Sequence, residues 1–359
     1  METKMKVIMP CAGSSSRFPN MRPKWMLTHP NGDLMIKQAF ECLKGIQKKD
    51  LIITILKEHE EKYDIVKGLK ENIGKEVQVV ILDEPTKSQS ETVFKTIQKT
   101  GLNEPFLVKD SDNYFSVDVS QSDKNYVCYS SLDEYDEINA KNKSYIVMND
   151  QGIIINIVEK KIVSQHFNVG GYFFKDPQKF AKTFEKLSKN NGSSEIYISN
   201  IIEDMILNEK EVFLGKKVTN YHDWGTLEDW RFYCQKFKTY FFDLDGIFFE
   251  NSAQYFKPRW EDAKFIEDNV KFLKELSDNP YMQIYLVTSR SESYRKMLEE
   301  KFSKLGIKYQ QLIMGVQHSK RIIVNDFADT NRYPSCEAIN IPRNSENLRK
   351  YLDNGKKGN

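Results

Sequence analysis

Short runs of apolar and β-branched residues alternate with stretches of helical periodicity in the first third of the chain. The apolar runs lie at residues 6–10, 51–56, 77–82 and 106–110. Helical patterns fall between them, for example at residues 35–45 and 92–100. Strands that alternate with helices in this way predict an α/β domain with a largely parallel sheet covered on both faces.

The pattern changes near residue 126 and again near residue 240. Residues 126–174 contain several strands in succession, with a hairpin signal at residues 149–152. Helical patterns follow at residues 177–189, 195–207 and 227–237. The stretch YFFDLDG at residues 240–246 then restarts the α/β alternation. The elements expected after it are helices at 262–277 and 292–305 and strands at 282–287 and 322–325. We therefore predict two docked domains, 1–238 and 239–359, without a flexible linker.

Composition narrows the class of protein. The 359 residues are 40% hydrophobic and 29% charged, which is typical of soluble globular proteins. A net charge of only +2 argues against a nucleic acid or a membrane surface as the main partner. We see neither a signal-peptide pattern nor an apolar run of the roughly 20 residues that span a bilayer. Five cysteines lie far apart, at Cys11, Cys42, Cys128, Cys234 and Cys336. They predict reduced, buried thiols in a cytoplasmic protein.

The loop after the first strand carries the first chemical signal. It contains a run of small residues from Ala12 to Ser16, followed by Arg17 and then Lys24. Small residues let backbone N–H groups approach a ligand closely, and two cations beyond them indicate a phosphate chain. Small-residue turns also end many strands for steric reasons alone. Another signal is therefore needed to decide between the two interpretations.

The second signal is a pair of acids after the strand at residues 106–110. Asp110 and Asp112 stand two residues apart, so an extended chain places both carboxylates on one side. Carboxylates in that arrangement suit Mg²⁺ that carries phosphates. The alternative is a solvated turn, which is the commoner fate of such a sequence.

Further motifs follow in a fixed order. They are QSET at residues 89–92, VEK at 158–160, NVGGYFF at 168–174 and HDWGT at 222–226. With these motifs, residues 5–238 resemble the nucleotidyltransferase family that makes activated sugars and polyols, the pyrophosphorylases with a GT-A-like Rossmannoid fold. The resemblance implies a Rossmannoid mixed-sheet domain at the N-terminal end of the chain.

The resemblance also implies a role for each motif. The nucleoside triphosphate would be bound by Ala12, Gly13, Ser14, Ser15, Ser16, Gln89 and Ser90. The acceptor pocket would be shaped by Glu159, Lys160, Asn168, Gly170 and Gly171, with Lys160 facing the acceptor's phosphate. Arg17 would stabilise charge on the phosphates, Lys24 would bridge the α-phosphate and the incoming phosphate, and Asp112 and Asp223 would hold Mg²⁺. Ser15 stands where the family usually has a glycine, so this loop departs from the family's pattern at one position.

The stretch FFDLDG at residues 241–246 resembles the first motif of the haloacid dehalogenase superfamily. This resemblance covers residues 240–352, is closest to small phosphatases associated with capsule synthesis, and implies a small Rossmannoid domain without a cap. Asp243 would be the nucleophile and Asp245 the acid/base. Thr288, Ser289 and Lys320 would bind the phosphoryl group, and Asp243, Asp245 and Asp326 would hold Mg²⁺. Arg321 is an alternative to Lys320 as the cation.

Together these motifs predict a bifunctional enzyme of cell-surface polysaccharide precursor synthesis. It would use an NTP, with CTP favoured, and a phosphorylated sugar or polyol, and its second domain would hydrolyse phosphomonoesters. Two alternatives stay open. The second domain could be an inactive scaffold, or the protein could be a glycosyltransferase whose Asp110-Ser111-Asp112 motif binds metal, although Arg17 and Lys24 would then lack a purpose. The sequence leaves open the nucleotide, the acceptor, the order of the reactions and whether the chain forms a homo-oligomer.

Overall fold

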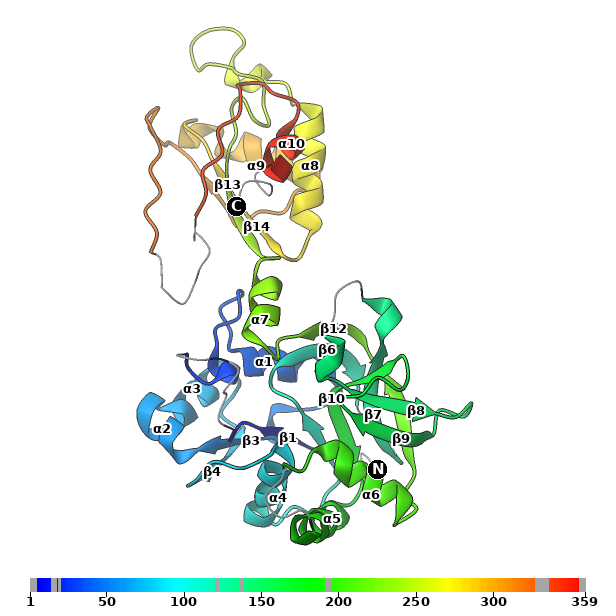
Figure 1. Ribbon diagram of the computed structural model, residues 1–359. Helices are drawn as coiled ribbons and strands as arrows, with labels where there is room; N and C mark the ends of the chain where they lie inside the picture. Colours follow the sequence, from blue (N-terminus) through cyan, green and yellow to red (C-terminus); the bar gives the residue numbers. More distant parts are fainter. Residues whose placement is uncertain are drawn as a thin grey trace. The chain divides into compact units, whose positions relative to one another are not determined.

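The computed structural model describes residues 5–13, 18, 21–119, 123–135, 139–190, 195–326 and 336–354. The chain divides into two compact units, Met1–Cys234 and Gln235–Asn359 (Figure 1). The sequence analysis places the boundary at Lys238, which is the first residue of a strand in the second unit. The two units are described separately below.

The described residues of the first unit form one large mixed sheet. Its strands are β1 (Lys6–Pro10), β3 (Leu51–Leu56), β4 (Gln78–Leu82), β5 (Phe106–Lys109), β7 (Asn125–Ser131), β8 (Ser144–Met148), β9 (Ile154–Glu159), β10 (His166–Phe174) and β11 (Phe213–Lys217). The order is β11-β7-β10-β5-β1-β3-β4, and β8 joins through β10 and carries β9. Strands β5, β1, β3 and β4 are parallel, whereas β10 runs antiparallel to β5 and β7. The buried run LIITIL of β3 matches a parallel strand that is covered on both faces.

Helices cover the sheet. They are α1 (Met35–Glu41), α2 (Lys57–Tyr63), α3 (Ile65–Asn72), α4 (Gln89–Thr100), α5 (Pro177–Asn190), α6 (Ile198–Leu207) and α7 (Leu227–Cys234). Short 3₁₀ turns occupy η1 (Lys24–Met26), η2 (Lys48–Asp50), η3 (Leu132–Glu134) and η4 (Ala140–Asn142). Figure 1 shows α4, α5 and α6 gathered on one side of the sheet, and their apolar side chains share a core with β1, β5 and β10.

Aromatic rings fill the centre of this core. The ring of Phe174 lies 5.3 Å from that of Phe106, 4.9 Å from that of Phe180 and 5.8 Å from that of Phe213. We expect Phe174→Ala to destabilise the protein by about 3–5 kcal/mol, because the fully buried ring would leave a cavity. The matched control is Ile155→Ala at a side chain that is 53% exposed, with an expected change within about 0.5 kcal/mol. Urea denaturation of both variants tests this, and equal midpoints would contradict it.

Several predicted boundaries shift for identifiable reasons. The helix predicted at 35–45 ends at Glu41, because Leu43 and Lys44 form β2 (Leu43–Lys44) and pair with β6 (Asn113–Asp118). The helix predicted from residue 92 begins at Gln89, where the Ser88 hydroxyl caps it by accepting from Glu91 N at 3.2 Å. At the other end of the unit, α6 begins three residues later than predicted and α7 ends three residues earlier.

The hairpin predicted at residues 149–152 is confirmed. It joins β8 and β9, and the side-chain oxygen of Asn149 accepts from the backbone N–H of Gln151 and of Ile153, both at 3.0 Å. Gly152 closes the turn with a φ of +73°, a value that favours glycine.

The second unit has a three-stranded parallel sheet in its described residues. Its elements are β13 (Lys238–Asp243), η5 (Trp260–Asp262), α8 (Glu267–Asp278), β14 (Met282–Val287), η6 (Glu292–Tyr294), α9 (Arg295–Lys304), β15 (Gln311–Ile313) and α10 (Leu348–Asn354). The strand order is β13-β14-β15. Helix α8 begins five residues later than predicted, because Phe265 instead bridges to Phe249. The helix predicted from residue 292 opens with the 3₁₀ turn η6.

The strand predicted at residues 322–325 is wrong. This segment lies outside the sheet, and Ile322, Ile323 and Val324 are exposed, Val324 by 91%. β-Branched residues stabilise a strand only when a neighbouring strand pairs with it and covers its side chains. Strands β13, β14 and β15 pair with one another and so meet that condition, whereas residues 322–325 pair with none of these strands.

The cysteine prediction holds in part. All five thiols are free, and Cys11, Cys42 and Cys128 are buried as predicted. Cys336 is exposed and Cys234 is half-buried, so the prediction of burial is wrong for these two. In the part of the chain that the structure describes, none of the helices is both long enough and apolar enough to span a bilayer.

Candidate active site

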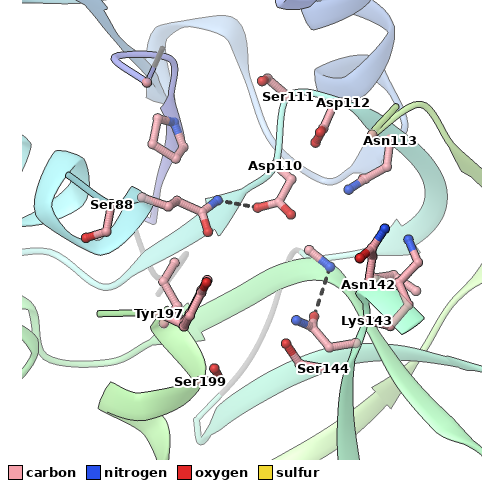
Figure 2. Close-up of a pocket in the computed structure, with 18 of the residues that line it drawn as sticks. Ser88, Asp110, Ser111, Asp112, Asn113, Asn142, Lys143, Ser144, Tyr197 and Ser199 are labelled. Carbon is pink, nitrogen blue, oxygen red and sulfur yellow. Dashed lines mark hydrogen bonds between the residues drawn. The ribbon is translucent and has the colours of Figure 1, made fainter. Parts of the chain in front are cut away.

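A cavity of about 370 Å³ opens in the first unit beyond the carboxyl ends of β1 and β5. Ligands of open α/β sheets bind at these strand ends because the loops converge there. Figure 2 shows Asp110, Asp112 and Asn113 along one wall of the cavity and Asn142, Lys143 and Ser144 along another. The cavity therefore joins the end of β5, where a metal ligand is predicted, to the ends of β8 and β9, where acceptor-binding residues are predicted.

The opening loop is described only in part. Gly13 lines the cavity, and a Cβ atom at this position would meet nothing within 4 Å. Ala12 is fully buried, and its carbonyl accepts from Thr86 N at 3.3 Å. Ala12 does not line the cavity, and its contact with the nucleotide stays a prediction. Ser14, Ser15, Ser16 and Arg17 lie outside the described residues.

The loop after β5 places the two predicted acids in the cavity wall. Gln89 donates a hydrogen bond to the Asp110 carboxylate, and Asp110 N donates to Gly170 O at 2.9 Å. Gly170 has a φ of +81°, and a Cβ atom there would lie 2.7 Å from Asn113 Nδ2 and closer still to the Asp110 carboxylate. Gly170 is therefore required where the backbone passes this loop.

Two lysine–aspartate pairs face the cavity. Lys24 binds the Asp112 carboxylate and Lys143 binds the Asp223 carboxylate. Strand β12 (Thr219–Asp223) pairs antiparallel to β6 with Asp223 opposite Asn113, which brings the two acids together from distant parts of the sequence. Trp224 N donates to Asp112 O at 2.9 Å, and this hydrogen bond also holds the residue after Asp223 against the loop that carries Asp112.

Burial and charge set the protonation of these acids. Burial and the adjacent charge of Asp112 raise the pKa of Asp110 to about 6. Burial acts on Asp112 in the same direction, but the ammonium of Lys24 outweighs it and lowers the pKa of Asp112 below its ordinary value. Asp112 is thus ionised over a wider pH range than Asp110, which suits a metal ligand.

A fully buried lysine holds this loop from below. Lys109 Nζ donates to Asp110 O at 2.8 Å, to Asn113 O at 3.0 Å and to Asn113 Oδ1 at 2.5 Å. Burial lowers the pKa of Lys109. The three bonds satisfy the ammonium and fix the turn that carries Asp112.

The carboxylates of Asp112 and Asp223 suit a Mg²⁺ ion that takes its remaining ligands from phosphate oxygens and water. Within the described residues, no group of three or more histidine, cysteine, aspartate or glutamate side chains is placed to hold a metal ion. Mg²⁺ commonly takes one or two carboxylates and completes its shell with phosphate oxygens and water. Asp112 and Asp223 supply such a pair at one end of the cavity.

Hydroxyl, amide and carboxylate groups form the opposite wall. Glu159 ends β9 and accepts from the hydroxyls of Ser144 and Ser199, the latter at 2.8 Å. Asn168 accepts from Gly170 N at 2.9 Å. Lys160 donates to the Tyr197 hydroxyl at 2.8 Å, and its Nζ lies 4.5 Å from the centre of that ring.

Besides Ala12, two predicted residues do not line the cavity. Ser90, predicted to bind the nucleoside triphosphate, is fully buried and donates to Ile196 O at 2.6 Å, whereas Ser88 lines the cavity. Gly171 packs inside the sheet, where a Cβ atom would lie 2.9 Å from Cys128 and Phe115. Side chains alternate along a strand, so Gly170 and Gly171 cannot both serve the same face.

Four residues that line the cavity were not predicted from the sequence: Lys143, Ser144, Tyr197 and Ser199. The hairpin at residues 149–152 was a usable signal for two of them, because the turn fixes the register of the strands that flank it. Counting outward from Met148 and Ile154 places Lys143 opposite Glu159, and a bulge near Met148 shifts the partner to Ser144. Tyr197 and Ser199 had no such signal, because only the packing of α6 on β9 brings them to the cavity.

The second unit brings part of its predicted site together. Asp243 and Asp245 lie at the end of β13, and Thr288 Oγ1 donates to Asp245 Oδ2 at 3.1 Å. Each acid is paired with an arginine, Asp243 with Arg321 at 3.2 Å and Asp245 with Arg290 at 2.7 Å. Of the two cations considered in the sequence analysis, Arg321 is the one that reaches the site.

The Mg²⁺ site predicted in this unit is not assembled. Arg290 is fully buried and also donates to Trp260 O at 3.2 Å, so it holds Asp245 firmly. Ser289 is half-buried, and Lys320 and Asp326 are exposed. Asp326 directly follows residues 322–325, which were wrongly predicted to form a strand, and among the described residues no group of three or more acidic, histidine or cysteine side chains is placed to hold a metal ion. We therefore assign no metal-dependent step to this unit.

Solved structures with the same fold cover the first unit. A nucleoside-diphosphate-sugar pyrophosphorylase from Vibrio cholerae RC9 is 16% identical, with a TM-score of 0.52 over 63% of this chain and 98% of that one. A CTP:phosphocholine cytidylyltransferase from Streptococcus pneumoniae is 19% identical, with a TM-score of 0.51 over 65% and 98%. An inositol-1-phosphate CTP transferase from T. maritima is 12% identical, with a TM-score of 0.50 over 64% and 92%.

These similarities establish the fold of the first unit as that of the sugar nucleotidyltransferases. No protein-family model matches the sequence, and no curated protein matches it significantly.

Proposed function

We propose that the first unit is a nucleotidyltransferase that transfers NMP from a nucleoside triphosphate to a phosphorylated sugar or polyol and releases pyrophosphate. The observation that carries this proposal is the pair of lysine–aspartate contacts, Lys24 with Asp112 and Lys143 with Asp223, in one cavity of this fold. In such a cavity the lysines can neutralise the charge of a triphosphate, and the carboxylates can hold a metal ion.

The chemistry follows from the placement of charge. An oxygen of the acceptor's phosphate attacks the α-phosphorus, a new P–O bond forms, and the bond to the pyrophosphate oxygen breaks. Asp112 and Asp223 would hold Mg²⁺, which when bound neutralises phosphate oxygens. Lys24 would stabilise the charge that shifts toward the leaving pyrophosphate, with Arg17 proposed for the same task. Positioning and electrostatic stabilisation supply the rate acceleration, without a covalent enzyme intermediate.

We further propose CTP as the nucleotide and a hydroxylated phosphomonoester as the acceptor. Two solved structures of the same fold are named for CTP-dependent transfer. The wall formed by Ser144, Glu159 and Ser199 offers hydrogen bonds to sugar or polyol hydroxyls. Such a product would serve as a precursor of a cell-surface polysaccharide.

Pyrophosphate release tests the proposal. The full chain is incubated with Mg²⁺, each of the four NTPs and a panel of sugar and polyol phosphates. We expect release with CTP and at least one phosphorylated acceptor. No release with any pair would overturn the proposal, and transfer of sugar from a nucleotide-sugar would favour the glycosyltransferase alternative.

We propose phosphomonoester hydrolysis as a second activity, which would make the enzyme bifunctional. The supporting observation is that β13 and β14 pair in parallel with Asp243 opposite Val287, and that Asp245, just after β13, accepts a hydrogen bond from Thr288, just after β14. Asp243 would attack the phosphorus and Asp245 would serve as the acid/base. The alternative is an inactive scaffold, since both acids are paired with arginines in this structure.

Asp243→Asn is expected to abolish phosphatase activity, because a neutral amide cannot replace the carboxylate nucleophile. Pyrophosphate release should persist at the wild-type rate, since Asp112 and Asp223 belong to the other unit. Hydrolysis of p-nitrophenyl phosphate and of the acceptor panel, each with Mg²⁺ or EDTA, provides the measurement. Absence of phosphatase activity in the wild-type chain would favour the scaffold, and loss of both activities in the variant would contradict independent sites.

A further inference from the structure

Lys143 occupies a position that no sequence motif marks. It lies between η4 and β8, and its side chain is 11% exposed. The ammonium binds the Asp223 carboxylate and donates to the Tyr221 hydroxyl at 2.5 Å. Its backbone carbonyl accepts from Lys160 N at 3.0 Å, which anchors it to the end of the β9 strand. Lys143 is therefore a fixed, largely buried cation in the cavity wall.

The charge of Lys143 can attract an anionic ligand once the nucleotide site is filled. Asp223 is its ion-pair partner, and its charge also reaches the cavity acids Asp112 and Asp229. The proposed Mg²⁺ would draw on Asp112 and Asp223. The phenol of Tyr221 is neutral and cannot balance the ammonium. An ammonium beside a metal-bound carboxylate then attracts an anion from the ligand.

The neighbours of Lys143 indicate which ligand supplies that anion. Ser144, the next residue, pairs with Glu159 across the hairpin and donates to its carboxylate. The cation therefore adjoins the wall that suits acceptor hydroxyls. Lys160, the residue predicted to face the acceptor's phosphate, also lines the cavity, but its side chain is exposed and its ammonium lies against the ring of Tyr197.

We infer that Lys143 binds the phosphate group of the acceptor, with the acceptor's hydroxyls placed along Ser144 and Glu159. This inference rests on the proposed function and deepens it. It assigns the acceptor as a phosphomonoester whose hydroxylated carbon chain extends away from Asp223, and it makes the phosphate the group that the site requires.

Direct binding tests the inference without catalysis. Glycerol 3-phosphate and glucose 1-phosphate are the probes, titrated by calorimetry into the full chain with Mg²⁺ and α,β-methylene-CTP. We expect at least one probe to bind, Lys143→Gln to weaken it tenfold or more, and Lys143→Arg to retain most of the affinity. Unaltered binding to Lys143→Gln, or no binding of either probe to the wild-type chain, would overturn the inference.

A matched control separates this effect from the loss of any ion pair. Lys186 pairs with Asp204 at 2.8 Å, and neither residue lines the cavity. Lys186→Gln should bind the probes as the wild type does. Circular dichroism should show that all variants are folded.

Kinetics distinguish failure of this inference from failure of the proposed function. With an acceptor that supports pyrophosphate release, Lys143→Gln should raise the acceptor's KM at least tenfold and leave the KM of CTP nearly unchanged. A rise confined to the KM of CTP would move Lys143 to the triphosphate side and overturn the inference, with the proposed function intact. Probe binding that depends on Lys143, without pyrophosphate release from any NTP, would overturn the proposed function alone.

Discussion

Replacing either Asp112 or Asp223 by asparagine should reduce pyrophosphate release by about a thousandfold or more. The amide keeps the shape of the side chain but removes the negative charge that would hold Mg²⁺. Loss of the metal ion would cost several kcal/mol of transition-state stabilisation. Both carboxylates line the cavity, and among the residues that the structure describes each forms an ion pair with a lysine of the same site. The fold should therefore survive either change. Turnover at saturating Mg²⁺, CTP and acceptor is the measurement.

Asp204→Asn is the matched control for this prediction. Asp204 is also paired with a lysine, its side chain is 10% exposed, and it lies away from the cavity. Its replacement should leave turnover near the wild-type value. Near-native turnover in Asp112→Asn or Asp223→Asn would show that the carboxylate is not a metal ligand. Equal losses in all three variants would show that a lost ion pair, and not a lost ligand, causes the effect.

Lys24→Ala should lower kcat by about a hundredfold to a thousandfold and change the KM of CTP only slightly. The reason is that the ammonium is most valuable when negative charge shifts to the departing pyrophosphate, which happens in the transition state and not in the bound substrate. In the structure Lys24 sits on η1 with its ammonium on Asp112, beside the proposed metal. Steady-state kinetics with the identified acceptor measures both constants.

A different kinetic result would contradict the transition-state role of Lys24. A rise in the KM of CTP with an unchanged kcat would make Lys24 a ground-state binding residue. Lys186→Ala controls for the removal of a half-buried lysine from an ion pair, and it should leave both constants unchanged. We expect Arg17→Ala to behave like Lys24→Ala.

Local patterns predicted most of the fold of the first unit. Strands such as Lys6–Pro10 and Leu51–Leu56 match the structure to the residue, because a strand buried on both faces is a continuous apolar run bounded by polar residues. The pattern failed at residues 322–325, where a run of β-branched residues does not join the sheet. The sequence shows the propensity of such a run, whereas pairing depends on which distant edge is available.

The candidate site was predictable where a motif ends a strand. Asp110 and Asp112 were predicted in this way and Asp223 from the HDWGT motif of the resemblance, and the structure places all three in the lining of one cavity. Lys143 was missed because it ends a short 3₁₀ turn and meets Asp223 across 80 residues of sequence. Ser90 was wrongly placed because helix α4 begins at Gln89, which turns the Ser90 side chain toward Ile196 and away from the cavity.

The fate of the α-phosphorus tests the central claim most directly. CTP labelled at the α-phosphate is incubated with the full chain, Mg²⁺ and the acceptor panel, and the products are separated and examined by phosphorus NMR. The account predicts that the label moves into a new P–O–P bond with the acceptor's phosphate while unlabelled pyrophosphate is released. Label that stays in CTP with every acceptor, or pyrophosphate that carries the label, would contradict it.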